Sequence, residues 1–118
     1  MKKTHLFFFR GLSTYGQDDA KWSIFNYGPI HQHFERAFVE RGFEFHPVLG
    51  MGAGPLDEVA DRAAAFLRAH PVWRDSSAEV HWLGHSAGGL ITRMALTRVE
   101  RQPRSLVTLA TPNVGSRL

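Results

Sequence analysis

The chain has 118 residues, which suffices for one domain and is too short for two. Its residues are 43% hydrophobic and 21% charged, a balance that is typical of a folded domain rather than a disordered segment. It contains no cysteine, so disulfides, thiolate metal ligands and a cysteine nucleophile are excluded. The net charge of +3 is too small, and the basic residues are too dispersed, to predict nucleic-acid binding.

The N-terminal segment joins two lysines to the short apolar run 6–9. A secretory signal peptide needs an apolar run of about 7 to 15 residues followed by a small-residue cleavage site, and this segment has neither. A transmembrane helix needs an apolar run of roughly 20 residues, and the chain has none. We therefore expect a buried strand here, no transmembrane segment, and a cytoplasmic location.

Strand and helix patterns alternate through the first half of the chain. An apolar run predicts a strand buried on both faces over residues 4–9. Pro29 and a one-sided apolar pattern then predict a helix that ends at Gly42. Residues 43–49 fit a second strand, which is followed by the glycine-rich segment 50–54.

The same alternation continues in the second half. Apolar side chains at three- and four-residue spacing predict a helix over residues 56–67, with acidic residues in its first turn. Strands are predicted over residues 79–83 and 104–110, with a helix over 87–99 between them. This order predicts an α/β fold with a parallel sheet of about four strands and helices on both faces.

The sequence Gly-His-Ser-Ala-Gly matches the pattern G-x-S-x-G and lies between a predicted strand and a predicted helix. A serine on such a tight turn has a strained backbone, and its hydroxyl projects above the carboxyl end of the sheet. Gly84 and Gly88 let the strand and helix approach closely around His85. We predict that Ser86 is a nucleophile and that the Ala87 N–H stabilises an oxyanion. The alternative is a glycine-rich connection in which the serine only caps the helix.

A second oxyanion donor is expected from the loop after the first strand. Gly11 permits a turn there, and the N–H of Leu12 is the expected donor, although the segment also fits an ordinary strand-to-loop turn. Tyr15 and Trp22 lie in the same loop. They are candidates for lining an acyl or aromatic pocket, or else they cover the core.

The segments FFFRGLSTYG, GHSAGG and LVTLATPNVGS together resemble lipases and esterases of the α/β-hydrolase superfamily. In that family they correspond to the oxyanion strand, the nucleophile elbow, and the next strand with its TPxxGS turn. The resemblance covers nearly the whole chain. It implies hydrolysis of a small acyl ester through an acyl-enzyme, with Ser86 as the nucleophile and the amides of Leu12 and Ala87 as oxyanion donors. Many members have His-Gly where this chain has Arg10-Gly11.

The catalytic triad of this fold runs serine, acid, histidine along the chain. Residues 111–118 contain no Asp, Glu or His. We therefore expect residues 1–118 to be a C-terminally truncated α/β-hydrolase domain that is weak or inactive, because serine without a general base is a poor nucleophile. The histidines present are not expected to substitute: His81 is predicted to pack in the core, and the family's strand order separates His46 from the elbow.

Two other functions stay open. The first is a non-catalytic α/β-hydrolase-like domain that binds a ligand or pairs with another chain, because the strand predicted over 104–110 leaves an exposed sheet edge for self-association. The second is nucleotide binding through the glycine-rich segment 50–54, although this segment does not match the dinucleotide-binding pattern G-x-G-x-x-G. No cofactor is expected, and no metal site, since His31 and His33 diverge on their predicted helix.

Overall fold

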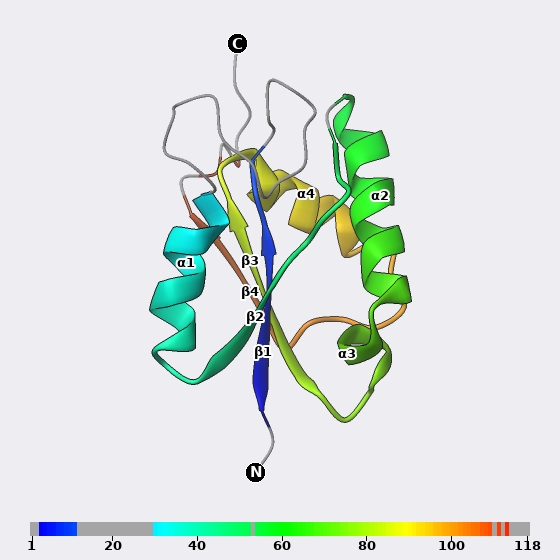
Figure 1. Ribbon diagram of the computed structural model, residues 1–118. Helices are drawn as coiled ribbons and strands as arrows, with labels where there is room; N and C mark the ends of the chain where they lie inside the picture. Colours follow the sequence, from blue (N-terminus) through cyan, green and yellow to red (C-terminus); the bar gives the residue numbers. More distant parts are fainter. Residues whose placement is uncertain (1–2, 12–29, 53, 110, 112, 114–118) are drawn as a thin grey trace.

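The computed structural model describes residues 3–11, 30–52, 54–109, 111 and 113. Its centre is a four-stranded sheet in which every pair of neighbouring strands is parallel (Figure 1). The strand order is β2-β1-β3-β4, made by β1 (Thr4–Phe9), β2 (Phe43–Pro47), β3 (Glu79–His85) and β4 (Ser105–Leu109). The prediction of an α/β fold with a parallel sheet of about four strands is confirmed.

Helices lie on both faces of this sheet (Figure 1). One face carries α1 (Ile30–Val39), and the other carries α2 (Leu56–Ala69), α3 (Pro71–Arg74) and α4 (Ala87–Ala95). The short helix α3 was not predicted from the sequence; Pro71 opens it, and the His70 side chain accepts the N–H of Val72. Within the described residues, every helix is too short or too polar to span a lipid bilayer.

The strand β1 is buried on both faces, as its continuous apolar run predicted. Its side chains alternate between two core clusters. Phe9 belongs to the cluster under α2 and α4, where its ring centroid lies 5.0 Å from that of Trp82. Phe8 belongs to the cluster under α1, where its ring centroid lies 4.9 Å from that of Phe34. This burial fixes the central strand, and with it the loop that leaves its carboxyl end.

Element bounds differ from the predictions mainly at the ends. The strand β2 ends at Pro47 rather than at 49, and α4 ends at Ala95 rather than at 99. The buried face of α4 also includes Thr92, a polar residue that was not predicted to face inward. Its hydroxyl donates a hydrogen bond of 2.6 Å to the carbonyl oxygen of Gly89, which satisfies the buried polar group.

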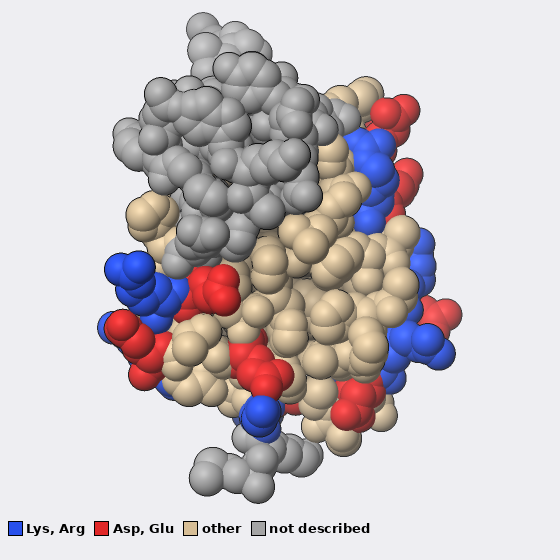
Figure 2. All heavy atoms as spheres, viewed as in Figure 1, with Lys and Arg blue, Asp and Glu red and all other residues tan. Residues whose placement is uncertain are grey.

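In Figure 2, Lys and Arg lie beside Asp and Glu along the margins of the described part of this molecular face, and its centre carries neither. Elsewhere Arg98 forms ion pairs with Asp57 and Asp61 of α2 at 3.1 and 2.7 Å. The described part of the face in Figure 2 therefore offers no extended surface of a single charge sign to a nucleic acid.

Candidate active site

Ser86 joins β3 to α4 on a tight turn. Its backbone angles are φ 56° and ψ −129°, and it is the only non-glycine with positive φ among the residues that the structure describes. Such a backbone costs a residue with a Cβ about 1–3 kcal/mol, and it persists only where its surroundings enforce it. The strain therefore falls on the serine that the sequence motif singled out.

Glycines enforce this turn by close contact. A Cβ on Gly84 would lie 2.5 Å from the Cα of Gly89, and a Cβ on Gly88 would lie 2.5 Å from the carbonyl oxygen of Arg10. A Cβ on Gly89 would overlap the side chain of Thr111. At all three glycines a Cβ would lie closer to its neighbour than real Cβ contacts allow. The start of α4 is thus pressed against the carboxyl ends of β3 and β1 and against the segment that follows β4.

Hydrogen bonds hold the backbone of Ser86 in place. Its N–H donates to the carbonyl oxygen of Leu109 at 2.8 Å. Its own carbonyl oxygen accepts the hydroxyl of Thr111 at 2.7 Å and the N–H of Gly89 at 3.0 Å. The role of Thr111 was not predicted from the sequence. Its position just after the last predicted strand of a parallel sheet was the available clue, because the carboxyl ends of parallel strands meet at one edge of the sheet.

The elbow places backbone donors near the hydroxyl. Ala87 is the first residue of α4, so its N–H has no acceptor within the helix and lies at the positive end of the helix dipole. Gly11 passes directly over the serine, because a Cβ built on it would lie 3.3 Å from the Cβ of Ser86. The other predicted donor, Leu12, and the pocket candidates Tyr15 and Trp22 lie outside the described residues.

Arg10 braces the loop that passes over the serine. Its side chain is buried, and its guanidinium donates to the carbonyl oxygens of Gly11 at 2.5 Å and Gly52 at 3.2 Å. Burial lowers the pKa of Arg10 below its usual value. The guanidinium thereby links the loop after β1 to the glycine-rich segment after β2.

No histidine or carboxylate within the described residues hydrogen-bonds the Ser86 hydroxyl. The neighbouring His85 ring packs against Phe34 of α1, with 5.4 Å between ring centroids, and burial lowers its pKa. His46 lies on β2, which β1 separates from β3. Burial, followed by the nearby His70 and His5, lowers the pKa of His46 to about 4. The described residues therefore present an elbow without its general base.

A hydrogen-bonded serine, histidine and carboxylate do meet at the other end of β3. The hydroxyl oxygen of Ser105 lies 2.6 Å from Nδ1 of His81, and Nε2 of His81 lies 3.1 Å from a carboxylate oxygen of Glu79. The expectation that His81 packs in the core is wrong, because its side chain is 20% exposed and hydrogen-bonded on both sides. Its hydrogen bond is the main cause that lowers the pKa of Glu79. Ser105, however, opens a regular strand, not a strained turn beside a helix N-terminus.

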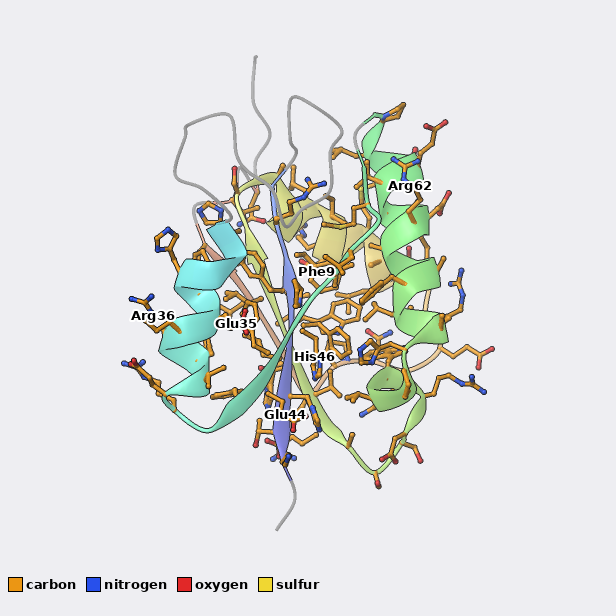
Figure 3. The ribbon with its side chains drawn as sticks, viewed as in Figure 1. Phe9, Glu35, Arg36, Glu44, His46 and Arg62 are labelled. Carbon is orange, nitrogen blue, oxygen red and sulfur yellow. The ribbon has the colours of Figure 1, made fainter. Side chains whose placement is uncertain are left out.

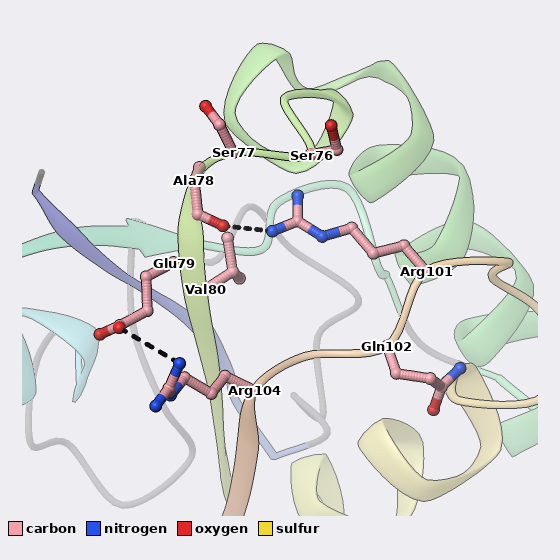
Figure 4. Close-up of a pocket in the computed structure, with 8 residues that line it drawn as sticks. All are labelled: Ser76, Ser77, Ala78, Glu79, Val80, Arg101, Gln102 and Arg104. Carbon is pink, nitrogen blue, oxygen red and sulfur yellow. Dashed lines mark hydrogen bonds and ion pairs between the residues drawn. The ribbon is translucent and has the colours of Figure 1, made fainter.

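A pocket at this same end of β3 is polar and already bridged by the protein's own groups (Figure 4). Arg101 reaches across it to donate to the carbonyl oxygens of Trp73 at 2.7 Å, of Asp75 at 2.8 Å and of Ala78. Arg104 lies 3.8 Å from Glu79 at the pocket's edge. Because Ser86 lies beyond the opposite end of β3, this pocket is no part of the elbow.

The glycine-rich segment 50–54 is arranged unlike a phosphate-binding loop. Its carbonyl oxygens face cations: Arg62 donates to Met51 at 2.6 Å and Arg10 donates to Gly52. Asp57 and Glu58 occupy the first turn of α2, where a phosphate would meet their negative charge. These contacts disfavour nucleotide binding at this segment.

No protein-family model matches the chain, and a search of curated proteins finds no match either. The assignment of this site therefore depends on the geometry around Ser86 and on the sequence motif that it occupies.

Proposed function

We propose that the chain carries the nucleophile of a serine carboxylic ester hydrolase of the lipase and esterase kind, within the α/β-hydrolase superfamily. The observation that supports this most is the strained backbone of Ser86 between a parallel strand and a helix N-terminus. A capping serine has no need of this strain, and Ser86 makes no side-chain capping hydrogen bond. The tight glycine contacts around the turn give further support.

The proposed chemistry is acyl transfer through the serine. The Ser86 oxygen attacks the carbonyl carbon of a small acyl ester, and its proton passes to a general base. The amides of Ala87 and Leu12 stabilise the oxyanion, the alcohol leaves with a proton, and water then releases the acid and restores the serine. The base must come from outside the described residues. Without it, the oxyanion donors alone leave only a small residual rate, so we expect this chain to be a feeble esterase.

The nucleophile is tested by labelling with a fluorophosphonate, which modifies activated serines. We expect slow labelling of the parent chain and none of Ser86→Ala. Ser105→Ala is the matched control, since it removes a serine hydroxyl of this chain that already contacts a histidine, and it should label like the parent. Mass spectrometry locates the adduct. Equal labelling of Ser86→Ala and the parent would refute the proposal.

A second candidate function is pairing with another copy of the chain through β4. This strand lies at the edge of the sheet, and two apolar side chains on one of its faces, Val107 and Leu109, are 51% and 41% exposed. An exposed apolar edge strand readily accepts another strand. This proposal is compatible with the first, because β4 pairs with β3 through one of its edges and would pair with another chain through the other.

We expect Val107→Lys to shift the protein from dimer to monomer, because a charge on the edge strand opposes pairing. Sedimentation equilibrium over a range of protein concentrations measures this. Val39→Lys is the matched control, since Val39 is 50% exposed and belongs to α1, which packs on the opposite edge strand β2. A parent chain that stays monomeric at high concentration would remove the pairing proposal.

A further inference from the structure

Two histidines and a glutamate converge on one face of the paired strands β1 and β2, in the half of β1 away from the elbow. Nδ1 of His5 lies 3.0 Å from Nε2 of His46 and 3.2 Å from Oε2 of Glu44. The three ligand atoms all lie within 4.8 Å of one another. Figure 3 shows Glu44 near the end of the sheet away from the loop that follows β1, and His46 further along the same strand, nearer the middle of the sheet.

The spacing of these atoms matches that of ligands around one transition-metal ion. Zinc binds histidine nitrogen and carboxylate oxygen at about 2.0–2.2 Å in tetrahedral geometry, which separates neighbouring ligand atoms by about 3.4 Å. The two short distances, 3.0 and 3.2 Å, lie near this value. Two histidines and one carboxylate form a common three-ligand set for zinc, with the fourth position open to water.

The strands hold the ligands in position before any ion binds. His5 pairs in register with Glu44, and His46 pairs with Phe7 two positions further along β1. His5 is buried, and its ring stacks on that of His46 with 5.2 Å between centroids. Ligands on paired strands are positioned more precisely than ligands on loops. Little ordering is therefore required when an ion binds.

Neighbouring groups limit the set to these three ligands. His70 packs near His46, but its Nδ1 accepts the N–H of Val72, so in the neutral ring the hydrogen is on Nε2 and no lone pair faces the cluster. Lys3 bonds the other carboxylate oxygen of Glu44 at 2.6 Å and opposes a cation. Its side chain is 70% exposed, however, and can move into solvent.

We propose that Nδ1 of His5, Nε2 of His46 and Oε2 of Glu44 bind one divalent transition-metal ion, with Zn²⁺ as the best match. Binding requires the neutral tautomers with the hydrogen on Nε2 of His5 and on Nδ1 of His46, so that the ring nitrogens that face each other at 3.0 Å both offer a lone pair to the ion. The ion ties the edge strand β2 to the central strand β1. His5 pairs with Val80, and the strand rise of about 3.3 Å per residue puts Ser86 about 20 Å further along, so the site is separate from the elbow.

The test is titration of the full metal-free chain with Zn²⁺ by calorimetry, and with Co²⁺ followed by its visible absorption, which reports the ligand geometry. We expect one ion per chain and a rise in the thermal unfolding midpoint on adding Zn²⁺. Glu44→Gln and His46→Gln should each weaken binding at least about tenfold. Both side chains are partly exposed, so these variants should still fold.

Two matched controls separate this site from scattered surface ligands. Glu79→Gln makes the same change at the start of another strand, and His33→Gln removes an exposed histidine of α1. Both should bind Zn²⁺ like the parent. Failure of the parent to bind, or equal binding by the parent and Glu44→Gln, would overturn the proposal. Labelling of Ser86 should be unaffected by Zn²⁺, so either proposal can fail without the other.

Discussion

Replacing Gly88 by alanine is expected to lower the free energy of unfolding by about 3 kcal/mol or more, the upper range for forcing atoms into a packed interior. The added Cβ would lie 2.5 Å from the carbonyl oxygen of Arg10 and closer still to that of Phe9. Both oxygens belong to the backbone at the end of the central strand, which cannot rotate away as a side chain can. Urea unfolding followed by circular dichroism measures the loss.

Gly42→Ala is the control for this substitution. Gly42 has φ +89°, and a Cβ there would meet no atom within 4 Å. Gly42→Ala should therefore lower the free energy of unfolding only by the cost of a left-handed backbone for alanine, about 1–2 kcal/mol. If both variants lose the same stability, the contact between α4 and the end of β1 is not what requires glycine at position 88, and the packing described for the elbow is incorrect.

The sequence predicted the parts of the fold that depend on local patterns. The apolar run of β1 indicated a strand buried on both faces, and the alternation of strands and helices indicated a parallel sheet. The motif around Ser86 indicated a strained turn, because glycines two positions before and after it serve a close approach of strand and helix. Each of these sequence patterns spans only the residues of the element that it predicts, or their near neighbours in the chain.

The features that the sequence did not predict depend on partners distant in the chain. Thr111 reaches the carbonyl of Ser86 only because β4 lies beside β3. His81 was expected in the core, but strand pairing sets Ser105 opposite it and supplies a hydrogen-bond partner. His5 and His46 are 41 residues apart, and only the register of β1 and β2 brings them together. No local pattern specifies such a register.

Replacing Ser86 by glycine is expected to stabilise the protein while abolishing fluorophosphonate labelling. The angles φ 56° and ψ −129° are the mirror image of an ordinary extended conformation, which glycine adopts as readily as its mirror form. Removing the backbone strain should raise the free energy of unfolding by about 1–3 kcal/mol. The greater conformational freedom of glycine in the unfolded chain should lower it by only about 0.5–1 kcal/mol. The net gain is therefore about 1 kcal/mol, measured by urea unfolding.

Ser105→Gly distinguishes this effect from a general benefit of glycine. Ser105 lies in a regular strand and its hydroxyl bonds His81, so glycine there should lower stability and leave labelling intact. A loss of stability in Ser86→Gly would mean that the serine backbone is not strained. A gain in stability in Ser86→Gly would show that the backbone of Ser86 is strained in the parent chain. The fold would then hold the proposed nucleophile in place at a cost in stability.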